Sequence, residues 1–463
     1  MEKRDVVVVG GGPAGYVAAI RASQLGARVA LIEEKHLGGT CLNWGCIPTK
    51  FMLHAVEVYE SIKQADQYGI KVAEAGLDLA KMQACKNRVI STLVSGVKSL
   101  MGRNNIEVID GRAKLTSTRE LEVDSGEGKR SIPADKIIIA NGSKPIDLPI
   151  PGIDSKGVLG TDGLITLEAI PESLLIIGGG VIGVEMATIW AKLGSKVTLV
   201  EMMPHCLPTQ DSELALMLQD TLRQVGIEIL CGSKVSSIAD TNAGKLVSIS
   251  CAGTESKLEV ATVAVAVGRQ PNPKNLGLEE CGIVASNKGI QVNDRMETGV
   301  PGIYAAGDVV GGMMLAYVSM AQGKVAAENA LGENTTIDYR AVPQCIFTQP
   351  EVASVGLTEE EAAAQGYEVR VGRFPFMASG MAAILGERRG MVKMVTETQY
   401  HGILGVHIIG PQATNLIMEA ALAVKLESTT GEILATMHPH PSLSEALWEA
   451  ALDVTGQAIH FDS

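Results

Sequence analysis

The feature that most constrains the fold of this chain is a glycine-rich turn that occurs twice, each time between an apolar run and a helical pattern. The first copy reads "DVVVVGGGPAGYVAAIRASQLGARVALIEE" and the second reads "SLLIIGGGVIGVEMATIWAKLGSKVTLVEM". Both predict a strand, a glycine turn, a helix and a second strand, which together begin a doubly wound parallel sheet. The acidic residue that closes the second strand follows the first glycine by 23 residues in each copy. The chain is therefore expected to contain two α/β domains built on the same plan.

The glycines of both turns fit the pattern G-x-G-x-x-G, which is typical of dinucleotide-binding sites. The three positions allow a tight turn, a close approach of the backbone to a pyrophosphate, and close packing of the helix on the strand. The helix N-terminus supplies N–H donors to the phosphates, and the closing acids, Glu33 and Glu201, can accept ribose hydroxyls. An isolated glycine motif also occurs in turns of other α/β proteins, but here the flanking strand, helix and acid are all present. The glycines concerned are Gly10, Gly12 and Gly15 in the first copy and Gly178, Gly180 and Gly183 in the second.

The second acid also bears on the choice of dinucleotide. A carboxylate at Glu201 repels a 2′-phosphate, and the segment "EMMPHC" that begins with it contains no arginine to bind one. The second site is therefore expected to prefer NAD to NADP.

Length and composition exclude several other classes of protein. The 463 residues are enough for about three domains, each with its own core, and the net charge of −13 argues against nucleic acid as the main partner. The longest apolar runs are broken by glycines and by Glu185, so no membrane span is expected. The first strand is expected within a few residues of Met1, so no leader peptide is expected. We therefore expect a protein of the reducing cytoplasm, where the eight cysteines are free thiols with room for one working pair.

Cys41 and Cys46 lie in the segment "GGTCLNWGCIPTK" and are the strongest candidates for redox chemistry. Their spacing fits no zinc motif, because there is no second C-x-x-C and no neighbouring pair of histidines. In a regular helix, residues five apart point about 140° away from each other, so a disulfide between them requires an irregular turn, which Gly45 permits. Pro48 can still occupy the first turn of the helix that follows, and a cysteine at a helix N-terminus has a lowered pKa that favours the thiolate. Two buried, unpaired cysteines remain the alternative interpretation.

Four segments together resemble the flavin-dependent pyridine-nucleotide–disulfide oxidoreductases, and the resemblance covers essentially the whole chain. "GGTCLNWGCIPTK" is similar to the redox-disulfide segment of that family, and "GIYAAGDV" to its second flavin-contacting segment. "CIFTQPEVASVGLTEEEA" is similar to the opening of its dimerisation domain, and "HPHPSLSEALWEA" to its catalytic histidine motif. Within the family, the chain looks most like the members that oxidise dihydrolipoamide.

The resemblance implies an α/β architecture with two Rossmann-like dinucleotide-binding domains, for FAD and NAD, and a C-terminal α+β dimerisation domain. The stretch "KIIIANGSKPIDLPIPG", rich in proline and glycine, indicates a crossing between domains, and the glycine fingerprint is absent beyond about Tyr339. The expected boundaries are 1–146 for the FAD domain with its redox disulfide, 147–268 for the NAD domain, 269–337 for a central segment returning to the FAD domain, and 338–463 for the dimerisation domain.

The resemblance also implies which residues contact the cofactors. In the first fold Glu33 is expected on the adenosine ribose of FAD and Asp308 near its ribityl chain, and in the second fold Glu201 on a ribose of NAD. Lys50 and Glu185 match the lysine–glutamate pair that lies beside the flavin ring in the family. Taken singly, each could be an ordinary helix, surface or turn residue, and it is their joint placement that favours the functional interpretation. The full set is Gly10, Gly12, Gly15, Glu33, Lys50 and Asp308 for FAD, and Gly178, Gly180, Gly183, Glu185, Glu201 and Gly268 for NAD, with no metal site expected.

His440 is the candidate acid–base group. Imidazole titrates near neutral pH, which suits the removal of a proton from a thiol. Glu445, five residues on, can orient the ring and stabilise its cation. His438 is interpreted as structural, because the pattern H-P-x-x-S-E selects His440. In the family this motif comes from the partner subunit, which implies a homodimer with a shared active site.

The reaction implied by the resemblance is oxidation of protein-bound dihydrolipoamide to lipoamide with reduction of NAD to NADH. Cys41 would face the substrate and Cys46 the flavin, with His440 and Glu445 moving the proton. Because the chain has no lipoyl domain, the expected partner is a lipoyl-carrying acyltransferase or carrier protein, in a 2-oxoacid dehydrogenase or glycine cleavage complex.

The nearest alternative is another NAD(P)H-dependent disulfide reductase of the same family. Glutathione-type reductases prefer NADPH, and mercuric reductases carry a C-terminal cysteine pair that the ending "GQAIHFDS" lacks. A non-enzymatic nucleotide-binding scaffold would leave the cysteine pair and His440 without a role. Three residues depart from the usual family pattern: Trp44 replaces a small aliphatic residue, Thr49 a serine and Tyr317 a histidine. Trp44 is interpreted as packing, and Tyr317 either as packing or as a residue that tunes the flavin.

Overall fold

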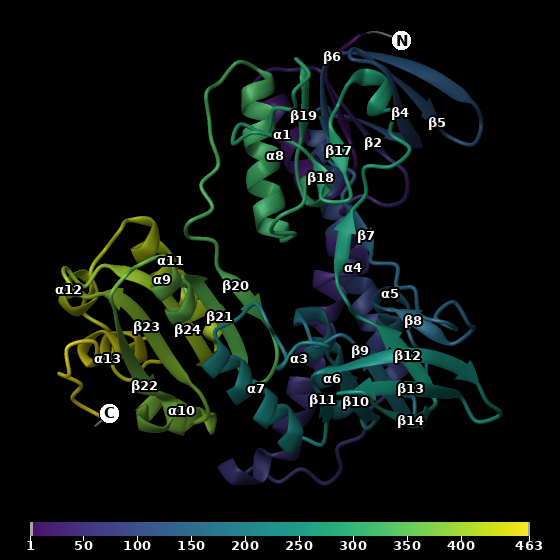
Figure 1. Ribbon diagram of the computed structural model, residues 1–463. Coiled ribbons are helices and arrows are strands. Elements are labelled where there is room, and N and C mark those ends of the chain that lie inside the picture. The colour runs from purple at the N-terminus through teal and green to yellow at the C-terminus, as the bar shows by residue number, and fades with distance from the viewer. Residues whose placement is uncertain (1–2, 462–463) are drawn as a thin grey trace.

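The computed structural model describes residues 3–461, which form three units, each built on a β-sheet with its own helices (Figure 1). The first unit lies at the top of the view in Figure 1, the second lies below it, and the third lies beside the second. Within residues 3–461, no helix is both long and apolar enough to cross a membrane.

The first unit contains a seven-stranded sheet: β1 (Arg4–Val9), β2 (Val29–Glu33), β3 (Glu107–Asp110), β4 (Arg112–Ser117), β5 (Glu120–Asp124), β6 (Lys129–Ile139) and β19 (Ile303–Ala305). β1, β2, β3, β6 and β19 pair in parallel, and β4, β5 and β6 pair antiparallel. The valine run of β1 explains why the parallel part is buried on both faces: Val6 and Val8 join one core cluster, and Val7 and Val9 join another. Its helices are α1 (Pro13–Gln24), α2 (Gly39–Asn43), α3 (Cys46–Lys63), η1 (Ala65–Tyr68), α4 (Leu79–Arg103) and α8 (Ala316–Ala330).

The second unit repeats this plan with a five-stranded parallel sheet in the order β11-β10-β9-β15-β8. Its strands are β8 (Val158–Gly160), β9 (Ser173–Ile177), β10 (Lys196–Val200), β11 (Glu228–Leu230) and β15 (Thr262–Val265), with an antiparallel sheet of β12 (Ser233–Asp240), β13 (Lys245–Cys251) and β14 (Thr254–Val260). Its helices are α5 (Thr161–Ile165), α6 (Val181–Leu193) and α7 (Ser212–Gln224). Helix α3 of the first unit packs against α6, and this contact brings the two units together beside the redox segment.

The chain crosses between these units twice, and the two crossings pair with each other. β7 (Ser143–Pro145) leads into the second unit, and β16 (Arg269–Pro271) leads back, in antiparallel register. The returning segment contains η2 (Glu279–Cys281), β17 (Ala285–Ser286), β18 (Gly289–Ile290) and η3 (Asp308–Val310) before it reaches α8. β19 and α8 thus complete the first unit from a position about 300 residues along the chain.

The third unit is a five-stranded antiparallel sheet in the order β20-β21-β24-β23-β22, covered by helices α11 and α13. Its strands are β20 (Gln344–Ile346), β21 (Glu351–Gly356), β22 (Val369–Pro375), β23 (Met391–Glu397) and β24 (Ile403–Gly410). Its helices are α9 (Glu359–Ala364), η4 (Phe376–Ala378), α10 (Gly380–Leu385), α11 (Ala413–Lys425), α12 (Thr430–Ala435) and α13 (Glu445–Asp453).

Candidate active site

The redox segment contains the helix break that the cysteine spacing predicted. Cys41 lies in α2, which ends at Asn43, and Cys46 is the first residue of α3. Gly45, between them, has φ −118° and ψ −107°, and a Cβ added there would lie 3.1 Å from the Thr40 carbonyl oxygen. A side chain at this position would therefore press on α2, and glycine keeps the break tight.

The two cysteines are thiols in this structure and lie within hydrogen-bonding range of each other. The hydrogen bond from Cys41 and the positive charge of Lys50 together lower the pKa of Cys46 to about 7, although burial opposes the shift. The same hydrogen bond, together with burial, raises the pKa of Cys41. The pair therefore holds its proton on Cys41 and its negative charge on Cys46 near neutral pH.

Lys50 and Glu185 form an ion pair where the three units meet. Lys50 Nζ, on the second turn of α3, donates to both carboxylate oxygens of Glu185 at 2.9 and 2.8 Å. Glu185, on α6, is only 2% exposed, and its Oε1 also accepts the backbone N–H of Phe347 at 3.0 Å. The Lys50 ammonium lies 4.8 Å from the centroid of the Phe347 ring. The carboxylate is thus bonded from two sides, and the lysine is held close enough to Cys46 to affect its charge.

The two glycine turns have nearly the same geometry. Gly10 and Gly178 have φ of 103° and 108°, values that favour glycine. A Cβ added to Gly15 or Gly183 would lie 1.8 Å from the carbonyl oxygen of the first glycine of the same turn. Each helix is therefore packed against its own turn in a way that only glycine permits.

The acids that close the turns also have matching partners. Glu33 Oε2 accepts the N–H of Gly11 at 2.6 Å, and Glu201 Oε2 accepts that of Gly179 at 2.6 Å. Their second oxygens accept backbone N–H groups two residues further on, from Lys35 and Met203, both at 2.8 Å. Because a carboxylate has about four lone-pair sites, each acid can still accept a ribose hydroxyl.

Asp308 begins η3 and is held by two serines. Ser143 Oγ donates to Oδ2 at 2.5 Å, and Ser319 Oγ donates to Oδ1 at 3.4 Å. Gly307, just before it, has φ 81°, and its N–H donates to Gln322 Oε1 at 2.7 Å. These bonds fix the aspartate between the first crossing strand and α8.

His440 and Glu445 interact as the sequence predicted, in the third unit. His440 Nδ1 lies 2.8 Å from Glu445 Oε1, and the other carboxylate oxygen accepts the N–H of Ser442 at 2.8 Å. Although burial opposes the shift, these two hydrogen bonds hold the pKa of Glu445 below its ordinary value. The imidazole is 80% exposed, and within residues 3–461 neither redox cysteine is its hydrogen-bond partner.

Comparison with known proteins identifies the family. Residues 4–323 match the pyridine nucleotide-disulphide oxidoreductases, and residues 342–451 match the dimerisation domain of the same group. The chain belongs to this family.

Several members of this family match the chain over nearly its full length. Proteins named dihydrolipoyl dehydrogenase from Bacillus subtilis strain 168 and Thermus scotoductus are 43% and 44% identical to the chain, over 99% of each chain. The solved structure of LpdA from Mycobacterium tuberculosis superposes with a TM-score of 0.89 at 29% identity, covering 96% of this chain and 98% of that one. The predicted fold class, oxidoreductase activity and use of FAD and NAD are confirmed by these matches.

The residues present fit two dinucleotides. Gly12 and Gly180 cap the N-termini of α1 and α6 without any capping side chain, and so leave N–H groups available. An added Cβ would meet nothing within 4 Å at Gly180, and at Gly12 only the Gly39 Cα at 3.9 Å. Each helix N-terminus thus faces space that a diphosphate can enter. Gly268, in the second crossing, has φ 96° and accepts the N–H of Ile146 through its carbonyl at 3.2 Å.

The three departures from the oxidoreductase pattern have structural partners. The half-buried Trp44 ring lies 5.5 Å from the His36 ring, centroid to centroid. Thr49 is buried in α3, and the Tyr317 hydroxyl donates to the Pro343 carbonyl oxygen. His438, interpreted as structural, has both ring nitrogens bonded, to Thr436 O at 3.0 Å and Glu419 Oε1 at 2.9 Å.

Sequence reasoning missed Arg269, which links the crossing strands to the redox segment. Its Nε donates to Ser143 Oγ at 2.7 Å, and its Nη2 donates to Ser143 O at 2.8 Å and to Thr40 Oγ1 at 3.5 Å. Ser143 in turn bonds Asp308, so the arginine connects the residue before Cys41 with the aspartate of η3. The one feature of the sequence that could have indicated a role for Arg269 is its position directly after Gly268, a predicted site residue.

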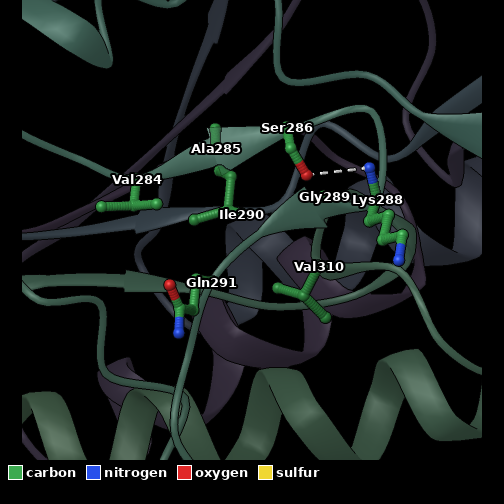
Figure 2. A pocket seen from close by; sticks show the side chains of 8 residues that line it. All are labelled: Val284, Ala285, Ser286, Lys288, Gly289, Ile290, Gln291 and Val310. Carbon is green, nitrogen blue, oxygen red and sulfur yellow. Dashed lines mark hydrogen bonds between the residues drawn. The ribbon is translucent and has the colours of Figure 1, made fainter.

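A surface cavity of about 270 Å³ lies in the first unit, and Figure 2 shows it. It is formed by the β17–β18 hairpin and Val310, and none of the predicted site residues lines it. The hairpin packs tightly on η3, because a Cβ added at Gly289 would lie 2.7 Å from the Val309 carbonyl oxygen. The hairpin thus contacts the end of η3, the short helix that begins with Asp308.

Proposed function

We propose that this oxidoreductase oxidises protein-bound dihydrolipoamide to lipoamide and passes the electrons through Cys41, Cys46 and FAD to NAD. The observation that carries the proposal is the arrangement of the two thiols, with the proton on Cys41 and the negative charge on Cys46 beside Lys50. The full-length relatives named dihydrolipoyl dehydrogenase supply the substrate class.

The thiol exchange follows from this arrangement. In the oxidised enzyme the two cysteines form a disulfide, and one substrate thiolate attacks the sulfur of Cys41. The Cys41–Cys46 bond breaks, and Cys46 departs as a thiolate, which a pKa of about 7 favours. The second substrate thiol then displaces Cys41 from the mixed disulfide, closes the lipoyl ring and gives its proton to Cys41. FAD, which the first glycine turn, Glu33 and Asp308 would hold, would supply the two-electron chemistry that links this dithiol to NAD at the second turn.

His440 of the partner subunit takes the proton from the first substrate thiol. The bond between Nδ1 and Glu445 orients the ring and leaves Nε2 for the substrate. Because the pKa of Glu445 is lowered, its carboxylate stays charged and stabilises the imidazolium that forms. The high exposure of the imidazole within one subunit agrees with a role completed across a dimer interface.

A homodimer is supported by the match to a dimerisation domain and by exposed apolar side chains in the same unit. Met418 and Leu422 on α11 and Leu426 at its C-terminal cap are all exposed and recur every four residues, and Met437 is 97% exposed. A second copy of the chain would bury this stripe. We further propose a lipoyl-carrying acyltransferase or carrier protein as partner, and the reducing cytoplasm as compartment, where cysteines outside the working pair stay reduced.

The acid–base assignment is tested with His440→Gln. We expect kcat for dihydrolipoamide oxidation to fall by about 10²–10⁴-fold, which is the usual contribution of general acid–base catalysis. His460→Gln is the matched control, because His460 is also exposed and also pairs with a glutamate, Glu449, at 2.6 Å. Unchanged turnover in His440→Gln would refute the assignment.

The substrate class is tested by comparing turnover of dihydrolipoamide and NAD with reduction of glutathione disulfide by NADPH. Dihydrolipoamide with NAD should be the faster pair, since Glu201 disfavours a 2′-phosphate. Faster reduction of glutathione disulfide would overturn the proposed substrate in favour of a glutathione-type reductase.

A further inference from the structure

A second pair of thiols, Cys206 and Cys231, lies in the second unit rather than in the redox segment. Cys206 is fully buried in the loop after β10, and Cys231 directly follows β11 and is half-buried. Their thiols lie within hydrogen-bonding range of each other. Both residues also bond to one acceptor, Gln219 Oε1, which takes the Cys206 N–H at 3.1 Å and the Cys231 S–H at 3.2 Å. The side chain of Gln219, on α7, thus holds the two cysteines together.

Both cysteines adjoin backbone bonds that position the dinucleotide site. Leu207, the residue after Cys206, donates its N–H to the Gly179 carbonyl in the glycine turn at 2.9 Å. Leu230, the residue before Cys231, accepts the N–H of Glu201 at 2.9 Å. Gly232, the residue after it, donates its N–H to Met203 O at 2.9 Å. A movement of Cys206 would therefore be transmitted to the glycine turn, and a movement of Cys231 to the backbone on either side of Glu201.

We propose that Cys206 and Cys231 are a second oxidisable dithiol, which a small aliphatic disulfide converts to an intramolecular disulfide, and that this bond weakens the binding of NAD. Cys231 reacts first because it is the more exposed of the two. Its thiolate attacks the small disulfide, which gives a mixed disulfide and releases one small thiol. Cys206 then displaces the second small thiol and forms the Cys206–Cys231 bond. Two protein thiols are oxidised and one disulfide is reduced to two thiols, so electrons and protons balance.

The Cys206–Cys231 disulfide would weaken NAD binding by displacing the backbone on either side of the two cysteines. It shortens the distance between the sulfurs from a hydrogen-bonded contact to about 2.05 Å. It also removes the S–H donor that Cys231 gives to Gln219. Leu207 and Gly232 are adjacent to the linked residues, so the displacement passes to the Gly179 carbonyl and to the loop that follows Glu201.

This pair should react more slowly than the redox pair. Burial raises the pKa of both Cys206 and Cys231, whereas the pKa of Cys46 is lowered to about 7. Because the thiolate is the reactive form, the second pair is oxidised only when small disulfides accumulate. The inference rests on the proposed function to the extent that NAD occupies the second fold.

The test uses FAD-containing protein with Cys41→Ser and Cys46→Ser, in which the redox pair cannot contribute. NAD is titrated calorimetrically before and after treatment with cystamine, and non-reducing peptide mass spectrometry identifies the cross-links. We expect a peptide linking Cys206 to Cys231 and a dissociation constant for NAD at least fivefold higher, restored by dithiothreitol. Binding of NAD before treatment tests the proposed function separately from the inference.

Two further substitutions on this background serve as comparison and control. Cys231→Ala should abolish both the cross-link and the change in NAD affinity. Cys251→Ala, at an exposed cysteine at the end of β13, should leave both in place. The proposal is overturned if Cys251 becomes a mixed disulfide while no Cys206–Cys231 peptide forms, or if the linked protein binds NAD with unchanged affinity.

Discussion

The two dinucleotide-binding folds share the design of their turns and differ in what covers them. In the first, α8 packs along α1 so closely that a Cβ added at Gly323 would lie 2.2 Å from the Ala14 carbonyl oxygen. Gly307 approaches the same residue, since an added Cβ there would lie 2.8 Å from the Ala14 Cβ. The returning segment thus closes over the N-terminal turn of α1.

The loops that follow the two closing acids do not make this difference, because both are exposed and both then fold back onto the glycine turn. Met202 and Met203, directly after Glu201, are 70% and 47% exposed. Residues 34–36, directly after Glu33, are exposed as well, and Gly38 donates its N–H to the Gly11 carbonyl as Leu207 does to the Gly179 carbonyl. The packing of α8 on α1 is what distinguishes the first fold. The same turn can therefore serve a cofactor that stays, when later segments enclose it, and a substrate that exchanges, when they do not.

The largest expected effect comes from the third glycine of each turn. Gly15→Ala and Gly183→Ala each place a Cβ 1.8 Å from a carbonyl oxygen, a contact that forces the helix off its strand. Gly15→Ala should yield protein without FAD and without activity. Gly183→Ala should retain FAD and lose NAD reduction. Flavin absorbance and NAD titration measure the two losses separately.

Gly96→Ala, in α4, is the control for these substitutions, because an added Cβ there meets nothing within 4 Å. It should be neutral or stabilise the protein by about 0.5–1 kcal/mol. Loss of FAD in Gly183→Ala, with retention in Gly15→Ala, would reverse the assignment of the two folds.

The turns could be predicted from the sequence because the contacts among their glycines, helix and acid are local. The three glycines, the helix and the acid all fall within one short segment, and so does the break at Gly45 between the cysteines. The pairing of Lys50 with Glu185 was also predicted, but only through resemblance to a family, since 135 residues separate them.

The contacts between segments that lie far apart in the chain could not be recognised in the sequence. Gly323 resembles any other helical glycine until α8 is placed on α1. The N–H that Phe347 gives to Glu185 is a backbone group, which every residue but proline carries. Arg269 is one of many arginines until the crossing strands bring it to Ser143 and Thr40. Tertiary packing, rather than local pattern, decides these positions.

A smaller effect is expected when the closing acids lose their charge. Glu201→Gln should raise the dissociation constant for NAD by roughly 10-fold, since a hydrogen bond to a charged group is worth about 1.5–3 kcal/mol. Glu33→Gln should change the FAD content little, because α8 and Leu37 enclose the first turn. Calorimetric titration with NAD measures the effect of Glu201→Gln, and flavin absorbance measures that of Glu33→Gln. Equal losses at the two sites would show that the enclosure of the first fold contributes nothing to retention.

The smallest expected effect concerns Lys50 and Glu185, where each fold contributes one charge near Cys46. Lys50 lowers the pKa of Cys46 and Glu185 raises it. Lys50→Met should therefore move the pKa of Cys46 above about 7, and Glu185→Gln should move it below, each by roughly one unit or less. The measurement is the pH dependence of Cys46 alkylation by iodoacetamide in the reduced protein, with the site identified by peptide mass.

At neutral pH, Lys50→Met should then react more slowly than the parent protein and Glu185→Gln more quickly, because only the thiolate is alkylated. Lys63→Met, at the far end of α3 and paired with Glu60, is the matched control and should leave the profile in place. Opposite shifts would show that charge sets the reactivity of Cys46. Shifts in the same direction would instead mean that the pair affects Cys46 by holding α3 against α6, and not through the signs of its two charges.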